Sequence, residues 1–360
     1  QFPRSDYRPA WLYWSGRAYE ALHDKAADAR YTLAATDYMN TYYGRLALQR
    51  LVAAGGGPPP ERRLVGDAPG DDSAAMIAPL PPNASVVRAL LALGLYDQAI
   101  DELRYAQKVW GDSPPIQATL GWIYHERGDL RAGINAVKRA YPQYMAAGGE
   151  ELPPEILRVL FPVSYWPLIK KYSEQYKLDP YLIAALIAQE SNFAPDAKSP
   201  ANAYGLMQLL PSTGRQYARS LHMNRKFTLG MLTTAETNIR MGTAHFADLM
   251  RQFGGGAHYA LASYNAGENR VARWISERPG IDQDEFIDDI PFPETQGYVK
   301  RILGTAEDYR RLYGTREGAA IAEADVRPAV AHAAAQPPSK ASASRKPARK
   351  KKTSKSKKAA

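Results

Sequence analysis

A single carboxylate interrupts an apolar stripe in the segment 179–193. Asp179 can cap the first free N–H groups of a helix and Pro180 suits its first position, so the segment predicts a helix. Apolar residues recur along it with helical spacing: Leu182, Ile183, Leu186 and Ile187. The next position on that stripe is Glu190. A carboxylate on an apolar face either costs stability or serves chemistry, so Glu190 is the candidate proton donor.

Three further segments contain the residue types of a sugar-binding groove: 199–213, 260–267 and 290–299. They combine small, amide and aromatic residues, and Asn265 and Gly267 suit the end of a helix. Sugars present apolar faces that stack on aromatic rings, and hydroxyl groups that hydrogen-bond with amides. The pattern therefore indicates a groove for a polar polymer around Glu190. Considered alone, Glu190 also fits an ordinary surface charge at a helix end.

Helices must position these segments, because the hydrophobic spacing is helical almost throughout the chain. Residues 7–55 predict two or three amphipathic helices, whereas Gly and Pro clusters make 53–83 a loop or linker. Strand patterns are weak and confined to the surroundings of Phe292. The sequence therefore predicts an all-α protein.

An internal repeat lies between residues 84 and 145. Gly94 and Gly128 are 34 residues apart, and apolar or small residues recur at the same offset. The period resembles that of tetratricopeptide repeats, which are antiparallel helix pairs that stack into a superhelix. Two copies also fit a generic array of helical hairpins with no peptide-binding role. We expect one helical superhelical domain over 1–150, part of a longer one. Because about three repeats are usually needed to stand alone, we expect the repeat region to pack on the helices of 7–55 or on the following domain.

The formal charge of +9 comes from the C-terminal end of the chain. Residues 336–360 contain ten Lys and Arg and no acid, so the rest of the 360-residue chain carries about −1. This charge distribution disfavours a body that binds nucleic acid. Residues 315–360 are Ala-rich and then Lys/Arg-rich, which predicts a disordered tail. Such a tail either attracts anionic surfaces, such as cell wall, lipid or nucleic acid, or only solubilises the protein.

The pattern favours neither a metal site nor a membrane span. The chain has no cysteine, and its six histidines show no paired ligand spacing, so we expect no metal and no cofactor. No apolar run reaches the roughly 18–20 residues that span a bilayer. The chain opens with Gln1 and shows no signal-peptide pattern, so either a leader has been removed or the N-terminus is incomplete.

The four segments together, in this order, resemble the soluble lytic transglycosylases, whose catalytic domain is similar to goose-type lysozyme. The most specific part of the match is Glu-Ser-x-Phe at 190–193 with Gly-Leu-Met-Gln at 205–208. The resemblance implies a lysozyme-like α-helical catalytic domain over 160–314. It extends loosely to the N-terminal part, because the family carries an α-superhelix there and the stretch 42–47 looks like a piece of it.

The resemblance implies one catalytic residue and seven groove residues. Glu190 is expected to act first as acid and then as base. The residues expected to bind substrate are Ser199, Met207, Gln208, Tyr264, Asn265, Glu294 and Tyr298. Among them, Tyr264 is expected to face Glu190 as a hydrogen-bond partner. Tyr298 lies in the segment that closes the groove, where simple packing is the alternative role.

Two positions depart from the family pattern. Asn202 stands where the family usually has Gly, although Asn tolerates left-handed backbone better than most residues. His245 stands where the family usually has an aromatic Tyr. Neither is expected to touch the acid/base, so both bear on the shape of the groove.

The implied reaction is cleavage of peptidoglycan with a single carboxylate. Ordinary glycosidases use two, but no obvious second one accompanies Glu190, since Asp196 lies past the helix end. The resemblance implies that the substrate's N-acetyl group assists and that the 6-hydroxyl of N-acetylmuramic acid closes a 1,6-anhydro ring. Burial on the apolar side of its helix is expected to raise the pKa of Glu190.

Two other functions stay open on the sequence. One is a lysozyme-type hydrolase of the same glycan, and the other is a non-catalytic wall-binding scaffold built on the helical repeats. The preferred interpretation implies the periplasm of a Gram-negative bacterium and peptidoglycan glycan strands as the partner. It also suggests contacts with cell-wall synthesis proteins through the helical domain, and no specific nucleic acid.

Overall fold

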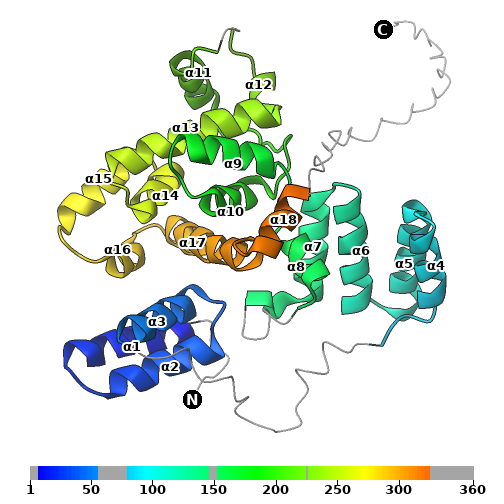
Figure 1. Cartoon of the computed structure of the whole chain (residues 1–360), viewed down its shortest axis with the longest axis horizontal. Helices are drawn as coiled ribbons and strands as arrows, with labels where there is room; N and C mark the ends of the chain where they lie inside the picture. The colour runs from blue at the N-terminus through cyan, green and yellow to red at the C-terminus, as the bar shows by residue number, and fades with distance from the viewer. Residues whose placement is uncertain (1–6, 56–78, 146–151, 224–225, 325–360) are drawn as a thin grey trace, which may run out of the picture.

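A computed structural model describes residues 7–55, 79–145, 152–223 and 226–324. These residues are largely helical, and their extended pairing is limited to two isolated bridges, from Tyr204 to Lys198 and to Leu209. The predicted all-α class is therefore confirmed. Phe292, the weak strand candidate, is the extended residue that precedes a long helix. Figure 1 shows the helices in three groups that follow the order of the chain.

The first group is a three-helix unit of α1 (Arg8–Ala21), α2 (Ala26–Asp37) and α3 (Tyr42–Ala53). Its own apolar core consists of Leu12, Tyr13, Ala27, Tyr31, Ala34, Ala35, Leu46 and Ala47. Helix α3 also contacts α17 (Pro293–Tyr313), and Figure 1 shows the unit beside α16 (Gln283–Asp289) and α17. The N-terminal helices therefore pack on the C-terminal ones, which sequence patterns alone did not predict.

The second group consists of helical hairpins. Helix α4 (Ala84–Ala92) pairs with α5 (Tyr96–Trp110), and α6 (Pro114–Glu126) pairs with α7 (Leu130–Ala140). Both hairpins turn at a glycine in the left-handed region, Gly94 at φ 69° and Gly128 at φ 78°. Only glycine adopts this conformation without steric cost, which explains the period of the repeat. The predicted helix pairs are thus confirmed, while most of the predicted loop over 53–83 lies outside the described residues.

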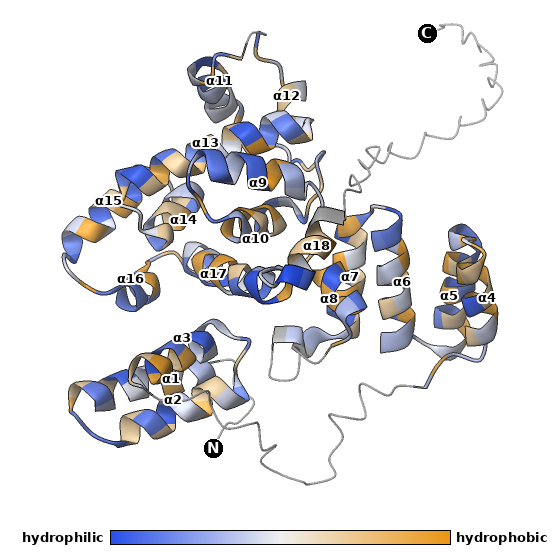
Figure 2. Ribbon diagram, in the orientation of Figure 1, coloured by the Kyte–Doolittle hydropathy of each residue, from blue (hydrophilic) through white to orange (hydrophobic). Residues whose placement is uncertain are grey.

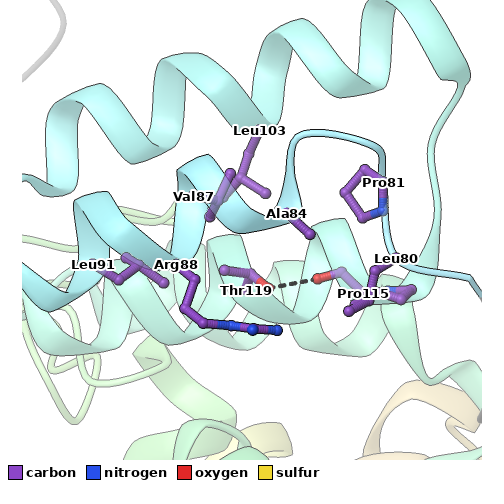
Figure 3. A pocket seen from close by; sticks show the side chains of 9 residues that line it. All are labelled: Leu80, Pro81, Ala84, Val87, Arg88, Leu91, Leu103, Pro115 and Thr119. Atoms are coloured by element: carbon purple, nitrogen blue, oxygen red, sulfur yellow. Dashed lines mark hydrogen bonds between the residues drawn. The ribbon is translucent and has the colours of Figure 1, made fainter.

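A small apolar hollow of about 160 Å³ lies among α4, α5 and α6 (Figure 3). Its lining consists of Leu80, Pro81, Ala84, Val87, Arg88, Leu91, Leu103, Pro115 and Thr119. The Thr119 hydroxyl donates to the Pro115 carbonyl of its own helix at 2.7 Å. No carboxylate lines this hollow, so it offers no group for acid–base chemistry.

The third group is built around α10 (Pro180–Ser191), which contacts α9 (Trp166–Gln175) and α17. The other helices of this group are α11 (Pro211–Ser220), α12 (Gly230–Thr233), α13 (Ala235–Gln252), α14 (Ala257–Ala266), α15 (Glu268–Glu277) and α18 (Arg316–Ala324), whereas η2 (Pro142–Met145) and α8 (Pro154–Leu160) contact α7 of the second group. Helix α10 is buried on all sides from Leu182 to Ile187, and Figure 2 draws it largely in apolar colours. It is a central helix, whereas the sequence predicted only an apolar stripe.

The largest apolar core crosses the boundary that was predicted between 150 and 160. Leu130 and Val137 of α7 and Leu157 of α8 belong to the same buried cluster as the residues of α10. The second hairpin and the third group therefore share one core. The catalytic region predicted over 160–314 is continuous with the helices that precede it.

The tail predicted over 315–360 needs a correction at its start. Residues Arg316–Ala324 form α18, which contacts α9 and α17 and buries Ala322 completely. Alanine has the highest helix propensity, so an Ala-rich stretch next to an apolar surface forms a helix more readily than its weak periodicity suggested. The rest of that prediction, 325–360, lies outside the described residues. Over the described part of the chain, no helix is both long and apolar enough to cross a membrane.

Candidate active site

Glu190 lies in the last turn of α10, and both ends of that helix are fixed. At the start, the Asp179 carboxylate accepts from the Tyr181 N–H at 2.9 Å, as the capping pattern predicted. Arg310 of α17 pairs with the other oxygen of the same carboxylate. At the end, Asn192 and Phe193 take left-handed conformations, at φ 49° and φ 60°, and stop the helix directly after the Glu-Ser pair.

Burial governs the ionisation of Glu190. The surrounding protein removes water from the carboxyl group and raises its pKa from 4.5 to about 7, the direction predicted from the sequence. A hydrogen bond from the Tyr298 hydroxyl to Glu190 Oε1, at 2.5 Å, opposes this effect because it stabilises the charged form. Within the described residues, no second carboxylate contributes to the shift. Glu190 is thus a solitary acid that is partly protonated near neutral pH.

Tyr298, rather than Tyr264, is the hydrogen-bond partner of Glu190. The Tyr264 hydroxyl donates instead to the Met207 carbonyl at 2.7 Å. Its ring still lies close enough to Glu190 for that carboxylate to help raise the pKa of the Tyr264 phenol, although burial is the larger cause. The sequence placed both tyrosines near the acid but exchanged their roles, because side-chain direction on α14 and α17 depends on how the two helices pack.

The loop that carries Gly-Leu-Met-Gln is tied to α10 and to α13. Ser191 donates to the Leu206 carbonyl at 2.9 Å, so the residue after the acid holds the loop directly. Gln208, at φ 45°, donates through its side-chain amide to the Gly205 carbonyl at 2.9 Å and the Ala197 carbonyl at 3.2 Å. These bonds give Gln208 a structural role and leave its side-chain carbonyl oxygen available to a ligand.

Asn238 on α13 is a site residue that the sequence analysis missed. Its side chain is fully buried; Oδ1 accepts from the Met207 N–H at 2.8 Å, and Nδ2 donates to the carbonyls of Tyr204 and Leu232 at 3.0 and 2.7 Å. One amide therefore satisfies three backbone groups of the loop and of α12. The only signal in the sequence is a polar amide among the apolar core positions of its helix.

Met207 does not line a groove with its side chain, contrary to the prediction. The side chain is fully buried and packs beneath Gly242, where a Cβ would lie 2.4 Å from the Met207 sulfur. A long apolar side chain in a loop gains stability from filling the core, and only the Met207 carbonyl faces the tyrosine of α14. Leu206 is buried as well.

The remaining predicted groove residues lie nearer the surface. The Ser199 hydroxyl accepts from the Ala203 N–H at 3.1 Å and remains able to donate to a ligand. Asn265 is exposed at the end of α14, and its side-chain oxygen accepts from Thr295 at 2.6 Å. Glu294 is exposed in the first turn of α17. The Asn265–Thr295 hydrogen bond thus joins the end of α14 to the start of α17, and the exposed Glu294 is the residue before Thr295.

Both departures from the family pattern are accommodated. Asn202 adopts φ 63°, the left-handed conformation that was expected of it. His245 lies between the rings of Tyr217 and Tyr264, with ring centroids 5.3 and 5.1 Å apart, and burial lowers its pKa to about 4. A neutral imidazole therefore supports the back of Tyr264. Among the described residues, no group of three or more His, Asp or Glu is arranged to hold a metal ion.

Comparison with known proteins identifies the same region. Residues 167–287 match the family described as Transglycosylase SLT domain, a range that includes Glu190 and Tyr264 but ends before Tyr298. A soluble lytic murein transglycosylase of Salmonella typhimurium is 37% identical over 310 residues, which cover 85% of this chain and 44% of the relative. One of Escherichia coli K12 is 36% identical over 157 residues, covering 43% of this chain and 24% of the relative.

Solved structures resemble the chain over most of its length. The 70 kDa soluble lytic transglycosylase of Escherichia coli superposes with a TM-score of 0.62 and 28% identity, covering 86% of this chain and 47% of that protein. The same enzyme in complex with bulgecin A gives a TM-score of 0.63 at 28% identity, covering 85% and 46%. The chain therefore spans less than half the length of each of these soluble lytic transglycosylases.

Proposed function

We propose that this chain is a peptidoglycan lytic transglycosylase, because its residues 167–287 match the Transglycosylase SLT domain family. It cleaves the β-1,4 bond between N-acetylmuramic acid and N-acetylglucosamine and leaves a 1,6-anhydromuramoyl end. The observation that carries this proposal is the state of Glu190, a solitary, partly buried carboxyl whose pKa is raised to about 7. Such a group can be protonated before the reaction and ionised during it.

Glu190 acts first as the general acid. Its carboxyl proton passes to the glycosidic oxygen as the bond from that oxygen to C1 of N-acetylmuramic acid breaks, which frees the hydroxyl of N-acetylglucosamine. The positive charge that develops at C1 is stabilised by the substrate's own N-acetyl group. Tyr298 donates to the carboxylate that remains and so lowers the cost of ionising it in a buried site.

Glu190 then acts as the base. The 6-hydroxyl of N-acetylmuramic acid attacks C1 and transfers its proton to the carboxylate, which closes the 1,6-anhydro ring and restores the starting protonation state. No water is consumed. One carboxylate suffices for both steps, whereas a two-carboxylate hydrolysis would need a second group beside the bond.

The other predicted groove residues orient the glycan in this proposal. Ser199 and Gln208 retain a hydroxyl donor and an amide oxygen for sugar hydroxyls. Asn265 of α14 and Glu294 of α17 present further exposed polar groups. Met207 contributes only its backbone carbonyl, which fixes Tyr264. The substrate lies outside the cytoplasmic membrane in this account, which places the protein in the periplasm. Contacts of the helical hairpins with wall-synthesis proteins remain a prediction.

Glu190→Gln tests the assignment of the acid. The amide keeps the shape of the side chain but has no proton to donate, so the release of soluble fragments from purified sacculi should fall by at least about 100-fold. Glu174→Gln, an exposed carboxyl of α9 outside the predicted groove exchanged in the same way, is the matched control and should retain the activity. Normal release by Glu190→Gln would remove Glu190 from the mechanism.

A further inference from the structure

We propose that the α1–α3 unit is a positioning device for the active site. In this proposal Tyr43, Asp288 and Lys300 hold the start of α17 so that the Tyr298 hydroxyl stays against Glu190. The inference rests on the proposed function, because its test measures the pH dependence that Glu190 gives to peptidoglycan cleavage. The proposal explains why the α1–α3 unit, which has its own apolar core, also packs against α17.

The contact between the unit and α16 is built from complementary charges. Asp284 is nearly buried and accepts from the Tyr13 hydroxyl, while Arg17 and Arg50 approach it to 3.4 and 3.3 Å. Arg17 also donates to Asp282, just before α16, at 2.6 Å. Buried charged partners fix geometry more strictly than an apolar contact does, because misplacement leaves a charge without its partner.

Asp288 at the end of α16 is the centre of this contact. It accepts from the Trp14 indole N–H and, at 2.7 Å, from the Tyr43 hydroxyl, and it pairs with Lys300 of α17. Lys300 also donates to the Tyr43 oxygen at 2.8 Å and lies 5.0 Å from the centre of the Tyr43 ring. Only 15% of the Lys300 side chain and 20% of the Asp288 side chain are exposed. Three elements therefore meet on one partly buried carboxylate.

Helix α17 carries these contacts and the active-site contacts within two turns. Thr295 donates to Asn265 of α14, Tyr298 donates to Glu190, and Lys300 engages the α1–α3 unit. Residues two apart on a helix point to nearly opposite sides. Tyr298 therefore contacts the active site from one face of α17, and Lys300 contacts the α1–α3 unit from the opposite face. Gln296 adds a bond from the same turn to the Asp288 carbonyl at 2.7 Å. A shift of the Lys300 side moves Tyr298 with it, because a helical turn is rigid.

A second ion pair of the same interface provides a matched control. Arg45 of α3 donates to Asp308 of α17 at 2.7 Å, and both side chains are largely buried, with 13% and 6% exposed. Asp308 lies ten residues beyond Tyr298, about 15 Å along the helix axis. A general loss of stability would follow from either pair, whereas a displacement of Tyr298 would follow only from the Asp288 cluster.

The experiment compares four variants of the full chain: Asp288→Asn, Tyr43→Phe, Tyr298→Phe and Asp308→Asn. The readout is kcat/KM on peptidoglycan as a function of pH, together with the melting temperature. The groups that face Glu190 are Tyr298 of α17 and Tyr264 of α14, and Arg301 binds the neighbouring Gln189. Since the Tyr298 hydroxyl favours the carboxylate form, its loss moves the alkaline limb, which Glu190 sets near pH 7, to higher pH.

We expect Asp288→Asn and Tyr43→Phe to move that limb upwards by about half a unit or more, in the same direction as Tyr298→Phe. Activity on the acidic plateau should fall about tenfold. Asp308→Asn should lower the melting temperature without moving the limb. The double variant Asp288→Asn with Tyr298→Phe should shift the limb no further than Tyr298→Phe alone.

An unmoved limb in Asp288→Asn and Tyr43→Phe, or an equal movement in Asp308→Asn, would overturn the proposal. Tyr43→Phe removes one hydroxyl and keeps the ring, so the position of the limb can be measured in this variant even where Asp288→Asn folds poorly. A carbon-13 NMR titration measures the pKa of the Glu190 carboxyl in each variant without substrate, and the Glu190→Gln variant assigns the signal. An inactive wild-type chain would instead contradict the proposed function and leave the titration as the test of this proposal.

Discussion

At the scale of single residues, Glu190 links stability to chemistry. Its pKa in the folded chain, about 7, exceeds the value of 4.5 for an unperturbed group. Between these values the native state binds more protons than the unfolded one, so stability falls as pH rises from 4.5 through 7. The folded protein thus carries this carboxyl at a cost in stability, as expected if Glu190 is the proton donor of the proposed reaction.

Replacement of this acid should therefore stabilise the protein at alkaline pH. We expect Glu190→Gln to exceed the wild type by up to about 3 kcal/mol in free energy of unfolding at pH 8, and to equal it near pH 4. Urea denaturation at the two pH values measures this difference. Glu294→Gln, on the surface, should show none. A Glu190→Gln variant less stable than the wild type at pH 8 would show that burial does not govern this carboxyl.

Sequence patterns identified Glu190 but not the groups that control it. The apolar spacing before it made Glu190 a candidate, and the family resemblance of Glu-Ser-x-Phe and Gly-Leu-Met-Gln supplied the predicted role. Tyr298 and Asn238 required the structure, because their roles come from helices far away in the sequence that pack against α10 and its loop. The same holds for Met207, whose buried side chain a motif cannot distinguish from a groove-lining one.

At the scale of elements, the loop after α10 depends on one glycine. Gly205 adopts φ 79°, and a Cβ there would lie 1.9 Å from the Leu232 carbonyl oxygen and 2.4 Å from the Asn238 amide nitrogen. A side chain would thus break the close approach of the loop to α12 and α13. The contact with Leu232 supplies a physical reason for a glycine at this position of the motif.

Two glycine substitutions distinguish the destabilisation caused by a steric clash from the destabilisation caused by a positive φ alone. Gly205→Ala should lose roughly 3 kcal/mol or more of stability and most of the activity, because neighbouring backbone cannot move aside. Gly267→Ala has a similar φ of 93° but no atom within 4 Å of a new Cβ, so it should cost only about 1 kcal/mol. Thermal melts and sacculus digestion measure both. Equal losses in the two variants would contradict the role given to the Leu232 contact.

At the scale of the whole molecule, the N-terminal helices and the active-site helices form one assembly. The helix pairs around Gly94 and Gly128 were predictable, because a local period specifies a local hairpin. The packing of α1–α3 on α16 and α17 was not, since Arg17, Arg50 and Asp284 lie far apart in the chain and share no motif. Long-range ion pairs of this kind leave no periodic signal.

Loss of one interface carboxylate should loosen the N-terminal unit selectively. Asp284→Asn removes the charge that Arg17 and Arg50 share, so amide hydrogen exchange in α1–α3 should accelerate about tenfold or more, while α4 and α5 stay unchanged. Exchange measured by mass spectrometry resolves these helices. Arg127→Gln, which breaks an exposed pair with Asp97, is the control. Uniform acceleration, or none in α1–α3, would argue against this interface.

The mass of the products tests the central claim most directly. Muropeptides released from purified sacculi by the wild-type chain should carry 1,6-anhydromuramoyl ends, which are lighter by one water than the reducing ends that hydrolysis leaves. The Glu190→Gln variant should release neither. Reducing ends as the main product would make the protein a hydrolase, and anhydro ends from Glu190→Gln would show that another group transfers the proton.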